Sequence, residues 1–348
     1  MSEDHEDLRR YHRQTLLPQI GEAGQRRLAA ARVLLVGCGA LGTTIADLLV
    51  RAGVGRLTVA DRDVVELTNL QRQTLFDEAD VAAGMPKAAA ATARLRRINS
   101  AVEVTPVVAD VHNGNVEDLL KAGVDLILDG TDNVQTRYLV NDVSVKHGIP
   151  WVYGAAVGVE GRVMGVVPGT TPCLRCVFPT PPGAAELPTC DTAGVLGMGA
   201  SIVAAYQAIE AVRILSGAGA SQTLLRLEFW PPRTHVVLTV EARRDDCVCC
   251  GTKRFEFLDA PAGDGAVSLC GRNSIQVRAS GRVMLDLAQM AERLASAGAV
   301  ERTPYFVRCR LADGPDVGLT VFPDARAIIH GITDPGRAKS LYARFVGC

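Results

Sequence analysis

The sequence lacks an excess of charge of either sign. Its 348 residues carry 37 Lys and Arg against 38 Asp and Glu, a formal net charge of −1 at pH 7. A chain with so small a net charge lacks the excess of positive charge with which proteins bind nucleic acid or an anionic membrane surface. We therefore expect neither nucleic acid nor a membrane as a partner.

The sequence also lacks a recognisable targeting segment and a long apolar run. Its first residues, MSEDHEDLRR, are acidic and then basic, without the apolar core of a signal peptide. The longest stretch free of charged residues is 192–209, and it contains Thr, Ser, Tyr, Gln and three Gly. This composition favours a buried helix over a membrane span. We expect a cytoplasmic protein, in which thiols stay reduced and the ten cysteines need a role other than disulfides.

What is present is an ordinary globular composition, with 48% apolar and 22% charged residues. The length favours two domains. A Pro- and Gly-rich break near residues 259–265 has no apolar periodicity and indicates a linker. We predict a large domain over residues 1–254, a linker at 255–265 and a small βαββα domain over 266–348.

The large domain alternates apolar strands with helices. Continuously apolar strands are expected at residues 32–36, 56–61, 102–110, 124–130 and 149–155. Such strands, separated by helices, are typical of a parallel sheet covered on both faces. After residue 150 the strands alternate more and are joined by Pro-rich turns, which indicates an antiparallel extension. The predicted fold class is α/β, a Rossmann-like and mainly parallel sheet, followed by a small α+β domain.

A glycine-rich motif marks a nucleotide site. The residues GCGALG at 37–42 follow a strand and open a helix, so backbone N–H groups and the helix dipole face a phosphate. Asp61 ends the next strand, where its carboxylate can accept from a ribose hydroxyl. The residues of the phosphate loop are Gly37, Gly39, Ala40, Leu41 and Gly42. The motif alone does not separate NAD from ATP.

Cations beyond the motif favour a triphosphate. Arg72 lies in NLQRQ, between Asn69 and Gln73, and Lys87 follows in MPK. A triphosphate about to be cleaved needs extra positive charge at the departing phosphates, whereas backbone amides suffice for a dinucleotide. The alternative is that these residues are surface cations of a solvated crossover.

DGTDN at 129–133 closes the fourth strand. Asp132 stands there at a strand end, close to the bound phosphates, and is a candidate Mg²⁺ ligand. It is also a candidate N-cap of the helix expected at 134–147, and both roles are compatible.

The cysteines give a second signal. Cys173 and Cys176 form one C-x-x-C pair, and Cys247 and Cys250 form another. Two such pairs in a chain with reduced thiols predict a tetrahedral zinc site with four cysteine ligands and no open position, hence a structural one. Unrelated thiols, including a redox pair, are the alternative. Cys249 is left out by the two-residue spacing.

Cys190 stands apart from these pairs, at the end of the Pro-rich segment FPTPPGAAELPTC and just before an expected helix. The positive end of a helix lowers a thiol pKa and raises its thiolate content, which is typical of a nucleophile. The alternative is an ordinary solvent-exposed loop cysteine.

Together, RYHRQ, VGCGALG, the D-R-D at 61–63, NLQRQ, PK, DGTDN, the paired C-x-x-C and TCDTAGV resemble the ThiF/MoeB family over about residues 8–254. These are adenylyltransferases that activate sulfur-carrier proteins and are related to ubiquitin-activating enzymes. The resemblance implies a homodimer that uses ATP and Mg²⁺ and a small ubiquitin-like carrier ending in Gly-Gly, with a persulfide source as sulfur donor.

The resemblance also implies roles for single residues. Arg13 would reach the partner subunit's phosphates, Arg72 and Lys87 would stabilise the triphosphate, Asp132 would hold Mg²⁺, and Cys190 would take part in sulfur handoff. The nucleotide-binding set implied in full is Gly37, Gly39, Ala40, Leu41, Gly42, Asp61, Asp63, Asn69, Arg72, Gln73, Lys87, Asp132 and Asn133.

The function predicted from the sequence is ATP-dependent adenylylation of the carrier's C-terminal glycine carboxylate, in preparation for thiocarboxylate formation. Two alternatives remain open: a nicotinamide-dependent oxidoreductase on the same fold, and a scaffold that binds nucleotide and carrier without turnover. The pathway served (thiamine, molybdopterin, tRNA or another) is not encoded here. The C-terminal domain lacks a convincing rhodanese loop and has no predicted function.

Overall fold

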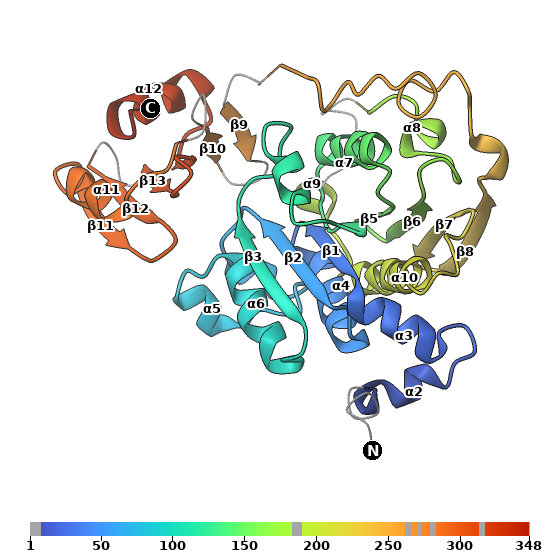
Figure 1. The fold of residues 1–348 in the computed structure, drawn as a ribbon. Coiled ribbons are helices and arrows are strands. Elements are labelled where there is room, and N and C mark those ends of the chain that lie inside the picture. Colours follow the sequence, from blue (N-terminus) through green and yellow to red (C-terminus); the bar gives the residue numbers. More distant parts are fainter. Residues whose placement is uncertain are drawn as a thin grey trace. The chain divides into compact units, whose positions relative to one another are not determined.

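A computed structural model describes residues 8–182, 190–261, 266–269, 273–278, 283–312 and 317–347. The chain divides into two compact units, Met1–Ala260 and Pro261–Cys348 (Figure 1). This boundary falls within the range 255–265 that the sequence marks as a linker. Residues Phe257 and Leu258 still belong to the first unit, because their backbone N–H groups donate to the Asp142 carboxylate.

Among the described residues of the first unit, eight strands form one sheet in the order β3-β2-β1-β4-β5-β6-β7-β8. The strands are β1 (Arg32–Val36), β2 (Arg56–Asp61), β3 (Glu103–Val108), β4 (Leu126–Asp129), β5 (Trp151–Val157), β6 (Glu160–Val166), β7 (Thr223–Phe229) and β8 (Pro232–Leu238). Along the sheet, the strands from β3 to β5 pair in parallel, and the strands from β5 to β8 pair antiparallel. The predicted Rossmann-like sheet with an antiparallel extension is confirmed.

Helices cover both faces of this sheet. The α-helices are α2 (His12–Thr15), α3 (Gly21–Ala30), α4 (Ala40–Ala52), α5 (Glu78–Ala82), α6 (Lys87–Ile98), α7 (Val134–His147), α8 (Leu174–Val177), α9 (Cys190–Ala193) and α10 (Gly197–Leu215), and the 3₁₀ turns are η1 (Arg9–Tyr11), η2 (Leu67–Asn69), η3 (Val116–Leu120) and η4 (Val240–Ala242). Side chains of α4, α6 and α10 share one buried cluster. Side chains of α7 share the other cluster with Cys173, Cys176 and Cys247.

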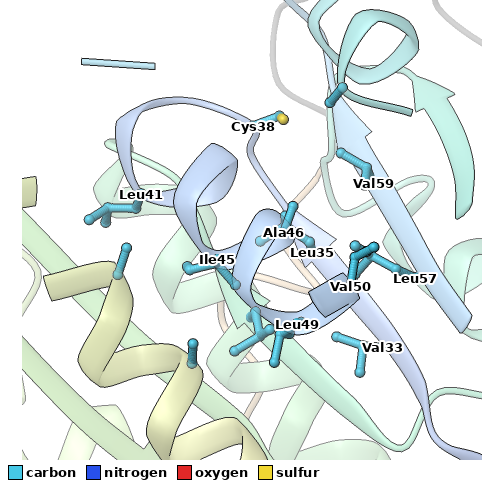
Figure 2. Close-up of a cluster of buried hydrophobic side chains, with 14 of the residues drawn as sticks. Val33, Leu35, Cys38, Leu41, Ile45, Ala46, Leu49, Val50, Leu57 and Val59 are labelled. Atoms are coloured by element: carbon cyan, nitrogen blue, oxygen red, sulfur yellow. The ribbon is translucent and has the colours of Figure 1, made fainter. Parts of the chain in front are cut away.

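The packing of α4 on the sheet follows from alternation along the strands. Val33 and Leu35 point to the α4 face of β1, where they meet Ile45 and Leu49, while Leu34 belongs to the cluster on the opposite face (Figure 2). Successive strand side chains alternate between faces, and residues three and four apart share a helix face. Two apolar patterns of different period therefore meet in one core.

Helix α10 begins within the segment 192–209 that the sequence predicts to be a buried helix, and it extends beyond that segment to Leu215. By length and composition alone it could cross a membrane. In the fold it packs along α4, β5 and β6. Its inward residues include Val203, Gln207 and Ala211, which are buried.

The N-terminal segment is fixed to the far end of α4. The Gln14 amide donates to the Ala52 carbonyl at 3.1 Å, and Asn99 donates to the Tyr11 hydroxyl at 2.8 Å. Gly53, the C-cap of α4, lies directly against Tyr11. Helix α4 has 13 residues and is about 20 Å long, so this attachment is remote from the glycine loop at its N-terminus.

The second unit differs from the predicted βαββα pattern. Its described elements are β9 (Ala266–Leu269), β10 (Ser274–Val277), α11 (Leu287–Leu294), β11 (Gly298–Arg302), β12 (Val307–Leu311), β13 (Gly318–Val321), β14 (Ala327–His330) and α12 (Pro335–Phe345). The six strands pair antiparallel in the order β11-β12-β13-β14-β10-β9.

The βαββα prediction was wrong in part because two of the runs taken as a strand contain a described tight turn. The Thr303 hydroxyl accepts from the Phe306 N–H between β11 and β12, and Ala325 takes a φ of 60° between β13 and β14. Apolar residues on both sides of such short turns resemble one continuous strand. The broader prediction of a small α+β domain is confirmed.

Prediction from the glycine loop. A Cβ on Gly42 would lie 2.0 Å from the Gly37 carbonyl oxygen, which is backbone and cannot rotate away. We expect Gly42→Ala to lower the free energy of unfolding by about 1–3 kcal/mol, the cost of overpacking a tight site. Gly39→Ala is the matched control, because its Cβ would have no neighbour closer than 3.9 Å. Equal unfolding midpoints in denaturant for the two variants would show that the close approach is not a constraint.

Candidate nucleotide and zinc sites

The glycine loop lies at the carboxyl ends of the parallel strands. Gly37 has a φ of 90°, and a Cβ on it would meet the Gly130 carbonyl carbon and oxygen at 2.7 Å. Gly39 is the N-cap of α4, which begins at Ala40 and also contains Leu41 and Gly42. Backbone N–H groups and a helix N-terminus therefore face one point, the arrangement that binds phosphate.

Asp61 supports this loop from β2. Its carboxylate accepts from the Cys38 N–H at 2.6 Å and from the Asp63 N–H at 2.7 Å. Burial raises the pKa of Asp61, and the neighbouring Lys87 partly offsets that effect. The residue predicted to accept from a ribose thus also fixes the glycine loop beside it.

A short antiparallel contact between Val64 and Pro86 positions Lys87 beside Asp63. The Lys87 N–H donates to the Asp63 carbonyl at 2.9 Å, and the Lys87 ammonium pairs with the Asp63 carboxylate at 2.9 Å. Lys87 is only 4% exposed. A cation so buried keeps its place and needs a charged partner, which Asp63 supplies.

The residues of NLQRQ have different positions. Asn69 is buried, and its side chain accepts from the Glu66 N–H at 3.0 Å, which fixes the 3₁₀ turn η2. Gln73 is buried beside Gly39, with its Oε1 atom lacking a hydrogen-bond partner. The Arg72 guanidinium donates to the Thr68 carbonyl and is partly exposed. Gln73 therefore lies beside the glycine loop, whereas the Arg72 stem lies beside Gly197 at the start of α10.

The DGTDN turn brings an acidic residue to the same edge. Asp132 is exposed at the end of the turn. The N-cap of α7 is Asn133, whose side chain accepts from the Thr136 N–H at 3.1 Å. The carboxylate of Asp132 is therefore not used as the helix cap. An exposed carboxylate beside a phosphate loop is the type of ligand that Mg²⁺ prefers.

A buried ion pair that the sequence analysis missed holds this turn. Asp129 accepts from the Arg137 Nε at 3.0 Å and from the Thr131 N–H at 2.9 Å, while Arg137 also donates to the Thr131 carbonyl. Gln207 of α10 donates to the Asp129 carbonyl at 2.7 Å. The only sequence signal was the position of Asp129 at a strand end.

Arg62 is a second residue that the sequence analysis missed, although D-R-D includes it. It lies between Asp61 and Asp63 and pairs with Asp110, beyond the end of β3, at 3.2 Å. Burial alone would lower the pKa of Arg62. Asp110 and the neighbouring carboxylates of Asp63, Asp61 and Asp132 more than offset it and raise that pKa.

Arg13 is not near the glycine loop of its own chain. It is exposed on α2, in the segment attached to the C-terminal end of α4. The nucleotide loop lies at the opposite end of that helix. The described fold thus holds Arg13 at the end of α4 opposite to the glycine loop.

Four cysteine sulfurs form a compact buried cluster. Cys173 Sγ lies 3.6 Å from Cys247 Sγ and 3.9 Å from Cys176 Sγ, and Cys176 Sγ lies 3.3 Å from Cys250 Sγ. All four sulfurs lie within 4.8 Å of one another. A tetrahedral zinc site with Zn–S bonds of 2.3 Å has sulfurs about 3.8 Å apart, so the cluster fits this ion.

The thiols resist deprotonation without a cation. Hydrogen bonding with Cys173 and burial raise the pKa of Cys176 to about 12, and burial above all raises the pKa of Cys250 to about 12. A bound divalent cation reverses this effect, because it stabilises thiolates directly.

Cys249 lies outside the four-sulfur cluster, as its spacing predicted. The Asn141 amide donates to Cys249 Sγ at 3.2 Å and accepts from the Leu174 N–H at 2.8 Å. One side chain of α7 therefore contacts both cysteine turns. This contact spans over a hundred residues of sequence, and no local pattern announced it.

Cys190 is the first residue of the four-residue helix α9, and its side chain lies outside the described residues. The long helix α10 begins only at Gly197, after Gly194 and the bridge at Val195. The expected long helix directly after Cys190 is thus absent from the described structure at that point.

Comparison with known proteins agrees with this geometry. The ThiF family model matches residues 11–249. The chain is 45% identical over 340 residues to the sulfur carrier protein ThiS adenylyltransferase of Bacillus subtilis, which covers 97% of this chain and 99% of that protein. It is 43% identical over 270 residues to the adenylyltransferase and sulfurtransferase MOCS3 of Mus musculus, covering 76% of this chain and 58% of that one.

Among solved structures, a crystal structure of E. coli MccB with MccA-N7isoASN superposes with a TM-score of 0.62 at 21% identity, covering 70% of this chain and 74% of that chain. At this identity the likeness concerns the fold alone. Two findings show the family of this chain. The family model matches most of it, and the identity to the Bacillus protein extends over nearly the whole of both chains. The chain belongs to the ThiF family.

Proposed function

We propose that the protein adenylylates the C-terminal glycine carboxylate of a ubiquitin-like sulfur carrier, with ATP as cosubstrate. The observation that carries this is the buried cation Lys87, which pairs with Asp63 and lies close to Asp61 and to Cys38 of the glycine loop. Such a cation suits a triphosphate whose bond to the α-phosphate is broken. The family relationship favours the same reaction over a nicotinamide-dependent oxidoreductase and over a scaffold without turnover.

The chemistry needs positioning and charge stabilisation. A carrier carboxylate oxygen attacks the α-phosphorus, the bond between the α-phosphorus and the bridging oxygen breaks, and pyrophosphate leaves with that electron pair. A carboxylate is already ionised at pH 7, so no general base is required. Lys87 and Arg72 stabilise the charge that moves onto the pyrophosphate, and the α4 N-terminus orients the phosphates.

Asp132 is the residue that would hold Mg²⁺, assisted by its place beside the glycine loop. When bound, the ion neutralises part of the triphosphate charge. The Asp129–Arg137 pair keeps the turn that carries Asp132 in one conformation.

A homodimer accounts for Arg13 and for an exposed apolar stripe. Arg13 is attached far from its own glycine loop, so in our proposal it serves the nucleotide of a partner subunit. Met198, Ile202, Tyr206 and Ile209 are exposed on α10 at spacings of three and four residues, which places them on one helix face. Such a face is typical of an interface between copies of a chain.

The proposed protein partner is a small carrier ending in Gly-Gly, and the proposed sulfur donor is a persulfide source. The edge strand β8 exposes Val236, Val237 and Leu238, an apolar surface suited to a folded protein substrate. Cys190 remains our candidate for the thiol that receives the carrier or relays sulfur after adenylylation.

We further propose that the four-cysteine cluster holds a structural zinc ion in the reducing cytoplasm. All four ligand positions are cysteine, which leaves no site for water or substrate. The ion would join the turn at 173–176 to the turn at 247–250. Both turns pack in the buried cluster that α7 covers.

Prediction for zinc. Metal analysis of the purified protein is expected to give one zinc per chain, because a closed four-cysteine site binds one ion. Cys173→Ser should lose the zinc and unfold or aggregate, since binding of the ion contributes to folding. Cys249→Ser is the matched control and should keep the zinc. A metal-free protein that folds with the same thermal midpoint would contradict the zinc site.

Prediction for the cations and the dimer. Arg13→Ala, Arg72→Ala and Lys87→Ala should each slow carrier-dependent exchange of labelled pyrophosphate into ATP by about 10²–10³-fold, the usual cost of losing one donor to developing charge. Arg94→Ala is the control, because Arg94 lies on the same helix as Lys87 and pairs at the surface with Asp77.

Mixed dimers then test whether Arg13 acts across the interface. Coexpressed Arg13→Ala and Lys87→Ala subunits form hybrids in which one site has both cations, so exchange should recover to about a quarter of the wild-type rate. No recovery, with hybrids demonstrated by mass, would mean that Arg13 acts within its own chain.

A further inference from the structure

The sheet order fixes where each part of a nucleotide lies. The glycine loop after β1 takes the phosphates, and Asp61 at the end of the neighbouring β2 takes the ribose. The strand beyond β2 is β3, whose Val108 pairs with Asp61 in register. In open α/β sheets the ligand extends across the carboxyl ends of the strands. The base therefore lies over the end of β3 and the residues that follow it.

Arg62 is placed at that position. Its guanidinium NH1 lies 3.2 Å from the Asp110 Oδ1, and its Nε lies 3.8 Å from the Asp63 Oδ1. The Arg62 side chain is 27% exposed, whereas the Asp110 side chain is 10% exposed. Two edges of a planar group thus face carboxylates, so the plane is fixed while part of its surface faces solvent.

We propose that Arg62 is the platform on which the adenine of ATP stacks, and that Asp110 is the positioning residue that orients the guanidinium plane. This inference rests on the proposed function and extends it to recognition of the base. Guanidinium groups stack on aromatic rings, which an ammonium group cannot do with the same geometry. Stacking of this kind is tolerant of the base, so Arg62 contributes affinity more than discrimination among bases.

The charges around Arg62 favour stacking over a role at the phosphates. Asp110 and Asp63 face its donors, and Asp61 and Asp132 also raise its pKa. Its positive charge is therefore balanced by carboxylates before any nucleotide binds. Lys87 by contrast lies at the start of α6, close to Asp61 and to Cys38 of the glycine loop.

The test is equilibrium binding, measured by calorimetry with two probes, ATP and inorganic tripolyphosphate. Arg62→Ala should weaken ATP binding by about tenfold, the scale of one stacked base, and leave tripolyphosphate binding unchanged. An equal loss for both probes would assign Arg62 to the phosphates and overturn the proposal. Unchanged ATP binding would overturn it as well.

Two further variants separate the plane from the charge. Arg62→Lys keeps the charge but not the plane, and should weaken ATP binding as Arg62→Ala does. Arg62→Tyr restores a planar surface without charge and should recover most of the affinity. Recovery by lysine and not by tyrosine would contradict stacking.

The matched control is Arg56→Ala. Arg56 joins the same two strands at their opposite end through Glu103, at 2.8 Å, so its loss tests stability without touching the base position. Thermal midpoints of all variants identify any loss of folding. Carrier-dependent pyrophosphate exchange by the wild type tests the proposed function separately. If exchange is absent while the variants bind as expected, the proposed adenylylation is contradicted and the stacking role of Arg62 is still supported.

Discussion

The close approach of two glycine turns is the constraint on which the site depends. Gly37 of the glycine loop and Gly130 after β4 leave no room for a Cβ on either residue, and the Gly130 N–H donates to the Val36 carbonyl. This contact joins the carboxyl ends of β1 and β4, where the strand order reverses. It places the phosphate loop and the Asp132 turn side by side, and a nucleotide site at such a point follows the general rule for open α/β sheets.

Around this contact the charges are arranged in pairs. Lys87 pairs with Asp63, Arg62 with Asp110, and Arg137 with Asp129. Removing one partner of a buried pair leaves an uncompensated charge, so each pair constrains the geometry of the other residues near it. We propose different roles for the three cations: Lys87 would stabilise the departing phosphates, Arg62 would support the base, and Arg137 would hold the turn that carries Asp132.

The sequence predicts those features whose signal is local. GCGALG predicts a phosphate-binding loop and the two C-x-x-C pairs predict a metal site, because the chemistry fixes the spacing of both motifs. The Asp129–Arg137 pair, the Gln207 contact and the Asn141 link to Cys249 depend on which distant segments pack together, and no local pattern encodes that. The hairpin turns of the second unit were missed for another reason: the turn at Pro323, Asp324 and Ala325 is short, and the apolar residues on both sides of it resemble one continuous strand.

The proposed reaction transfers AMP, and not phosphate or hydride, to a carrier carboxylate. The most direct measurement incubates the protein with a Gly-Gly-ended carrier and ATP labelled either at the α- or at the γ-phosphorus. We expect the carrier to acquire the α-label only and the γ-label to leave as pyrophosphate. A carrier with an amidated C-terminus should acquire neither label. A carrier that acquires the γ-label, or an amidated carrier that is still labelled, would contradict the proposed reaction.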